Sequence, residues 1–156
     1  MSVRTYYFDK VQNRFIYNLL SFKLLTNTYS IMNSKVFMVL RILLGLFVLM
    51  FGANKLVPGG FLPMPELSGD AVAYFGALSS SKTLLLVALV EVVAGLALIL
   101  NKFGALFTLI LMSVSVNAFL FHAVLDPGGI GGAVVLLLLN IAVLYGYKDK
   151  YNDLLS

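Results

Sequence analysis

The chain has 156 residues, of which 60% are hydrophobic and 12% are charged, and its formal net charge is +4. This composition, with a mean hydropathy of +0.96, excludes an ordinary water-soluble domain and indicates an integral membrane protein. The chain contains no cysteine, which excludes thiol–disulfide relays, thiolate metal sites and iron–sulfur clusters.

Residues 1–31 differ in composition from the rest of the chain. Their charged side chains are mostly basic: Arg4, Asp9, Lys10, Arg14 and Lys23. Apolar residues recur among them at helical spacing, which is typical of a basic amphipathic helix lying on the cytoplasmic leaflet. The alternative interpretation is sequence translated upstream of a start at Met32. In either case we expect an N-terminal extension followed by a membrane domain of residues 32–156.

Four apolar segments are each close to the length of about 20 residues that a membrane-spanning helix needs. The sequence Pro-Gly-Gly at 58–60 ends the first segment, and Asp-Pro-Gly-Gly at 126–129 separates the third from the fourth. We therefore expect an all-α fold, an integral membrane four-helix transmembrane bundle. The expected spans are at about residues 36–57, 83–100, 103–125 and 131–147.

The loop between the first and second spans is too polar to cross a bilayer. In it, Ser68 is placed to cap a helix, and the apolar positions that follow have the i, i+3, i+4, i+7 spacing of an amphipathic helix: Ala71, Tyr74, Phe75 and Leu78. We expect a short helix in this loop, at the extracytoplasmic surface of the membrane.

Lysine and arginine are distributed unequally between the two ends of the expected spans. One end carries the basic residues of the extension, Lys35, Lys102, Lys148 and Lys150, whereas the other carries only Lys55 and Lys82. Because cytoplasmic loops are enriched in these residues, we expect a multi-pass membrane protein with both termini in the cytoplasm. The same bias explains the positive net charge without a nucleic-acid partner.

Glu91 lies near the middle of the second span, where an ionisable group is costly and is by default a candidate site residue. Arg41 in the first span is its expected partner, because the two residues lie about 6 Å apart in depth. Two other interpretations stay open: Arg41 reaches the cytoplasmic headgroups and leaves Glu91 neutral, or Glu91 works as a proton or substrate site.

The remaining polar residues of the spans fall into two groups by depth. Arg41, Glu91, Ser113 and Asn140 form an inner group, and the outer group consists of Asn54, Lys55, Asn117, His122 and Asp126. We interpret Lys55 as an interfacial anchor, and Asn117 and Asn140 as interhelical hydrogen-bonding residues. Asp126, one turn beyond His122, could orient it. Since His122 is the only histidine, no metal site is expected.

Glycines 45 and 52 lie seven residues apart on the face of the first span that carries Arg41. They would let a neighbouring helix approach closely.

The membrane region resembles the DoxX family of small four-helix inner-membrane proteins over about residues 33–155. The resemblance is carried by RILLGLFVLMFGANKLV, AYFGALSSS, LVEVVAGLALILNKFG, NAFLFHAVLDPGGIG and LNIAVLYGYKDKY, in this order. The matching positions are Arg41, Gly52, Lys55, Glu91, Gly95, Asn117, His122 and Asn140. The resemblance implies a four-helix, multi-pass protein of the bacterial inner membrane without a defined activity of its own. Relatives include a subunit of thiosulfate:quinone oxidoreductase and a partner of a superoxide dismutase and a sulfurtransferase.

Two hypotheses about function follow. In the first, the chain is a membrane subunit or scaffold of an inner-membrane complex with no redox centre of its own, and the loop helix meets a protein partner. In the second, it belongs to a quinone-linked oxidoreductase or oxidative-stress complex, with Arg41, Glu91 and His122 on a quinone or proton path and Asn54, Lys55, Asn117 and Asn140 in a polar pocket. A homo-oligomer is compatible with both. A transporter fits less well, because no broken helix is visible in mid-membrane.

Overall fold

The computed structural model describes residues 33–62 and 66–152, together with Arg14 and Tyr17. The two interpretations of residues 1–31 therefore fall almost entirely on residues outside this set. The chain divides into two units, Met1–Ser34 and Lys35–Ser156, and the description below concerns the second unit.

Every regular element among the described residues is a helix. The elements are α2 (Ser34–Leu56), α3 (Asp70–Ser80), α4 (Thr83–Ile99), α5 (Gly104–Val124), η1 (Pro127–Gly129), α6 (Ile130–Gly146) and η2 (Lys148–Lys150), where η marks a 3₁₀ turn. The ends of α2, α4, α5 and α6 lie within two residues of the ends of the four expected spans, which confirms the all-α prediction.

Three helical segments are each long and apolar enough to cross a membrane: α2, α5, and α6 together with η1. The 17-residue α4 joins α3 at a bend of 79°, and the count becomes four if this bent pair forms a span. The bend lies at Ser81 and Lys82, where Lys82 takes a left-handed conformation (φ 62°). The short loop helix is present as α3, but it starts at Asp70 after Gly69, so the prediction that Ser68 caps it is wrong.

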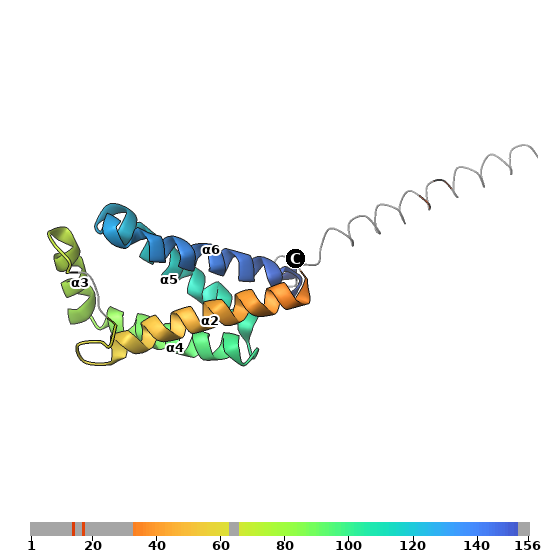
Figure 1. Ribbon diagram of the computed structural model, residues 1–156, viewed down its shortest axis with the longest axis horizontal. Coiled ribbons are helices and arrows are strands. Elements are labelled where there is room, and N and C mark those ends of the chain that lie inside the picture. Colours follow the sequence, from red (N-terminus) through yellow and green to blue (C-terminus); the bar gives the residue numbers. More distant parts are fainter. Residues whose placement is uncertain (1–13, 15–16, 18–32, 63–65, 153–156) are drawn as a thin grey trace, which may run out of the picture. The chain divides into compact units, whose positions relative to one another are not determined.

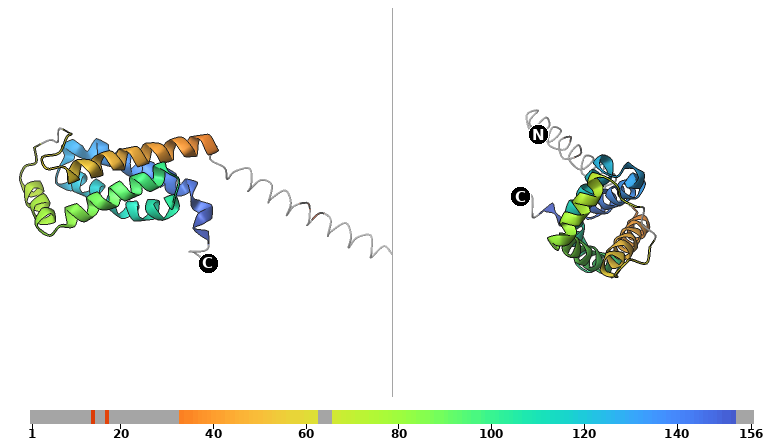
Figure 2. Two further views of the ribbon diagram at one scale, coloured as in Figure 1. Left: turned by 90° about the horizontal axis from the view of Figure 1, so that it is seen from below. Right: turned by 90° about the vertical axis from the view of Figure 1, so that its left-hand side faces the viewer.

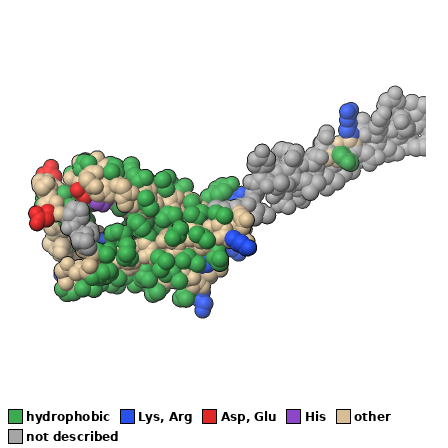
Figure 3. All heavy atoms as spheres, viewed as in Figure 1, with side chains coloured by type: hydrophobic (Ala, Val, Ile, Leu, Met, Phe, Trp, Pro, Cys, Tyr) green, Lys and Arg blue, Asp and Glu red, His purple; other side chains and the backbone are tan. Residues whose placement is uncertain are grey.

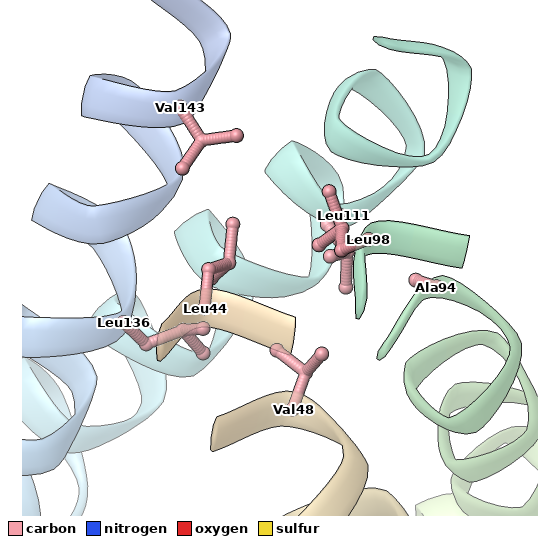
Figure 4. Close-up of a cluster of buried hydrophobic side chains, with 7 residues drawn as sticks. All are labelled: Leu44, Val48, Ala94, Leu98, Leu111, Leu136 and Val143. Carbon is pink, nitrogen blue, oxygen red and sulfur yellow. The ribbon is translucent and has the colours of Figure 1, made fainter. Parts of the chain in front are cut away.

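Side chains of four helices meet in one buried cluster, drawn in Figure 4. Its members are Leu44 and Val48 of α2, Ala94 and Leu98 of α4, Leu111 of α5, and Leu136 and Val143 of α6. Figures 1 and 2 show α2 beside α4 and α5 beside α6, with α3 across one end of these helices. Many large apolar side chains of the same helices point outward and stay exposed, which suits a surface that faces lipid.

Glycines bring α2 and α4 into backbone contact. A Cβ added to Gly95 would lie 2.8 Å from the carbonyl oxygen of Gly45, and one added to Gly52 would lie 2.7 Å from Cβ of Glu91. Both distances are too short for carbon at these positions, so only glycine permits this approach. The expected role of Gly45 and Gly52 is thereby confirmed.

Replacing Gly95 by alanine should separate α2 from α4, because the new methyl group meets backbone atoms that cannot rotate away. We expect Gly95→Ala to lower the free energy of unfolding by about 1–3 kcal/mol. Thermal unfolding followed by circular dichroism in detergent measures the change. The matched control is Gly132→Ala in α6, where no atom lies within 4 Å of the added Cβ. Equal stability of the two variants would contradict the close α2–α4 contact.

Candidate functional site

Glu91 forms an ion pair with Lys55. Nζ of Lys55 lies 2.6 Å from Oε2 of Glu91, and the pair joins the last turn of α2 to the middle of α4. The Glu91 side chain is 5% exposed and that of Lys55 is 23% exposed, so the acid is buried and the ammonium group is partly accessible. Gly52, one turn before Lys55, makes room for Cβ of Glu91.

The expected Arg41–Glu91 pair is therefore wrong, and the direction of helical side chains explains why. Each Cα–Cβ bond tilts toward the N-terminus of its own helix. In the antiparallel helices α2 and α4, Lys55 and Glu91 consequently lean toward each other along the helix axes, whereas Arg41 and Glu91 lean apart. Lys55, interpreted from the sequence as an interfacial anchor, is instead the partner of the buried acid.

Arg41 reaches the opposite end of α4. Its Nη1 donates a hydrogen bond to the carbonyl oxygen of Leu98, and the residue is only 7% exposed, so it does not extend to headgroups as one interpretation proposed. The end of α4 is shaped by Asn101, which adopts a left-handed conformation (φ 55°), while the amide of Lys102 donates to the carbonyl of Ala97 at 2.9 Å. This is a Schellman ending, and the Arg41 cation lies against its negative carbonyl end.

Asn54 fixes the loop that follows α2. Its Oδ1 accepts hydrogen bonds from the amides of Phe61 at 2.6 Å and Leu62 at 2.8 Å, and the residue is 6% exposed. Asn54 thus folds the loop back over the end of α2, next to the Lys55–Glu91 pair. From the sequence alone, Asn54 is expected in a polar pocket, and the spacing of residues along the chain does not distinguish a pocket residue from one that hydrogen-bonds to a loop.

His122 pairs with Asp126, as the one-turn spacing predicts. Nδ1 of His122 lies 2.8 Å from Oδ2 of Asp126, and both side chains are partly exposed at the end of α5. A Cβ at Gly129 would overlap the His122 ring, so η1 passes directly over the pair. The adjacent Phe121 contacts Tyr74 and Phe75 of α3, with ring centroids 5.5 and 5.1 Å apart, and so holds α3 at the same end.

Asn140 is the one residue of the inner group that links two helices through its amide. Its Nδ2 donates to Oγ of Ser115 at 2.8 Å, joining α6 to α5, and both residues are fully buried. The predicted interhelical role of Asn140 is confirmed. Its Oδ1 is buried without a hydrogen-bond partner among the described residues.

Ser113 and Asn117 do not face the interior. Both are exposed, and each donates to a carbonyl of its own helix: Ser113 to Ile110 and Asn117 to Ser113. The depth ordering concerns only the position along α5, and it does not specify the side of the helix. Their expected roles, in the inner group and between helices, are therefore wrong, and Ser115 occupies the interior instead.

The candidate residues with contacts between elements therefore lie in three places. Lys55–Glu91, Asn54 and His122–Asp126 lie toward the α3 end, and Arg41 lies toward the other end with the Leu98 carbonyl. Asn140 lies between α5 and α6 with Ser115. No group of three potential metal ligands occurs within residues 33–62 and 66–152. The two acid–base pairs, Lys55–Glu91 and His122–Asp126, can exchange protons and can bind polar groups.

Comparisons with known proteins leave the family open. No family model matches the chain, and no curated protein or solved structure matches it. The resemblance to the DoxX family consequently remains an interpretation of the sequence motifs.

A double-mutant cycle should detect coupling between Lys55 and Glu91. Lys55→Met and Glu91→Gln each remove one partner of a buried pair, and we expect their combined cost to fall below the sum by about 0.5–3 kcal/mol. Reversible unfolding in detergent measures the three free energies. Arg41→Met combined with Glu91→Gln is the control and should be additive, because Arg41 contacts Leu98 instead. Coupling of Arg41, with none of Lys55, would refute the assigned pairing.

Proposed function

We propose that the chain is a DoxX-like multi-pass protein of the bacterial inner membrane, with α2, α4, α5 and α6 as four spans of a bundle and α3 at the extracytoplasmic surface. The apolar helices support membrane insertion. The charges support the orientation, because acidic side chains gather at the α3 end and basic ones at the other end in Figure 3. By the enrichment of lysine and arginine on cytoplasmic sides, both termini are cytoplasmic.

Within that membrane, we propose the role of a subunit or scaffold of a protein complex without a redox centre of its own. The observation that carries it is that the charged side chains among the apolar helices are engaged inside the chain: the buried Glu91 with the partly exposed Lys55, and the buried Arg41 with the Leu98 carbonyl. Both contacts join α2 to α4. Groups used in this way fix helix register and do not need a ligand to account for their burial.

The exposed side of α3 is the surface offered to a partner. Ala71 is 1% exposed and Phe75 packs against Phe121, so one side of the helix faces the membrane domain. Val72, 53% exposed, and Ala73 lie on the other side. With α3 at the extracytoplasmic surface, a partner domain outside the membrane can reach this side.

The second candidate function is a membrane subunit of a quinone-linked oxidoreductase or oxidative-stress complex. It is favoured by the partial exposure of Lys55 and of the His122–Asp126 pair at the α3 end. The His122–Asp126 pair and the Glu91 carboxylate beside Lys55 could accept protons that a quinol releases on oxidation, while a partner subunit takes its electrons. In this case Glu91→Gln abolishes the activity of the complex, whereas in a scaffold it changes stability alone.

Purification in native lipid, followed by mass spectrometry of proteins and lipids, tests the scaffold role. We expect one protein partner at constant stoichiometry and no enrichment of quinone over the surrounding lipid. Glu91→Gln should lower the unfolding temperature yet keep the partner. Val72→Ser should weaken retention of the partner, whereas the matched Val124→Ser, at an exposed position of α5, should not. Bound quinone that disappears with Glu91→Gln would favour the second function.

A further inference from the structure

The end of the molecule opposite α3 carries a basic face that lies apart from the candidate site. It consists of Lys102 in the turn between α4 and α5, and Lys148 and Lys150 in η2 after α6. Lys102 and Lys150 are exposed, and Lys148 is partly exposed with its Nζ 4.9 Å from the ring centroid of Tyr145. Blue side chains gather at this end in Figure 3.

Two tyrosines hold the parts of the basic face together. The hydroxyl of Tyr147 donates to Oδ1 of Asn101 at 3.2 Å, and that of Tyr151 donates to the carbonyl of Ala105 at 2.8 Å. Residues 147–151 are thereby tied against residues 101–105, although they lie 46 positions apart in the chain. Burial raises the pKa of Tyr151 to about 12, with a smaller contribution from Tyr147, so its hydroxyl keeps the donating proton.

The basic face has little negative charge to offset it. Asp149 is the single acidic side chain among the described residues at this end, and Arg41 lies buried against the end of α4 beneath the face. At the opposite end, by contrast, the segments beside α3 and after α5 contain three acidic residues as well as the exposed Lys82: Glu66, Asp70 and Asp126. The two ends thus differ in the charge that they present to the two membrane surfaces.

Apolar side chains border the basic face. Phe103 is 76% exposed and Leu100 is 64% exposed, on either side of Lys102 in the turn. Phe103 has a φ of 57°, a backbone conformation that residues with bulky side chains rarely adopt. Burial of the ring in the protein does not compensate this strain, because the ring is exposed. An exposed aromatic ring beside lysine, at the end of two spans, suits the boundary between acyl chains and headgroups.

We propose that the basic face binds the anionic phospholipid headgroups of the leaflet that it meets. The three lysines supply positive charge to the phosphate, while Phe103 and Leu100 insert among the upper acyl carbons. Juxtamembrane lysines attract anionic lipids in this way, and basic pockets between spans retain them. The inference rests on the proposed membrane placement and is independent of the scaffold role.

The test uses the full-length chain in vesicles of phosphatidylcholine with phosphatidylglycerol, followed by native mass spectrometry of the lipid that stays bound. We expect phosphatidylglycerol to be enriched on the protein, and Lys102→Gln to reduce this enrichment about fivefold. The variant with Lys102, Lys148 and Lys150 all replaced by glutamine should lose it. High salt should weaken the enrichment, since it screens exposed charges.

Lys82→Gln is the matched control, because it removes one exposed lysine at the opposite end. It should leave the enrichment unchanged. The proposal is overturned if Lys82→Gln acts like Lys102→Gln, if the triple variant retains phosphatidylglycerol, or if inorganic phosphate displaces the lipid fully and so identifies a site for the free ion. Failure to find a protein partner would count against the scaffold role and leave the lipid result unaffected.

Discussion

The ion pair between Lys55 and Glu91 is the constraint on which the membrane region depends. An unpaired carboxylate or ammonium group among apolar helices costs several kcal/mol, so each helix must present its charge at the height of the partner. At 2.6 Å the pair allows little sliding between α2 and α4. Gly45, Gly52 and Gly95 are needed at the same interface, because the two backbones must approach closely enough for the charges to meet. Packing and electrostatics therefore fix the same register.

Side-chain direction decides which charges can pair across two antiparallel helices. Lys55 points back toward the middle of α2 and Glu91 points toward the α3 end, so the two side chains converge from different positions along the helix axes. Arg41 points back toward the end of α4, where the carbonyls of the last turn carry partial negative charge and accept its hydrogen bond. The α2–α4 pair thus contains two cations, Lys55 and Arg41, and one anion, Glu91. Glu91 compensates the charge of Lys55, and the carbonyl end of α4 compensates that of Arg41. The arrangement ties α2 to both halves of α4.

Much of this fold follows from apolar length and from proline and glycine positions, since the four helices end within two residues of the expected limits. His122–Asp126 also follows, because the pair lies within one helix turn. Pairing between helices is harder to derive. Depth along the membrane normal alone favoured Arg41 for Glu91, and it could not tell Ser113 from Ser115, which lie two residues apart on different sides of α5. From the sequence alone, residue 147 is only the end of the fourth expected span. Tyr147 in fact donates a hydrogen bond to Asn101, and a tyrosine hydroxyl close to a turn is a feature that can indicate such a contact.

The engagement of the buried charges bears on the choice between a scaffold and a quinone-linked subunit. A group that already donates or accepts inside the chain must break that contact before it binds a ligand, and in a low-dielectric setting the broken contact is costly. Lys55 and Glu91 would have to exchange a proton or separate, and separation would loosen the α2–α4 register as well. Because His122 and Asp126 lie partly exposed at the end of α5, they could act without that cost. Any proton chemistry at the α3 end is therefore expected to begin at His122, and Glu91 takes part only by giving up the contact that keeps the two helices in place.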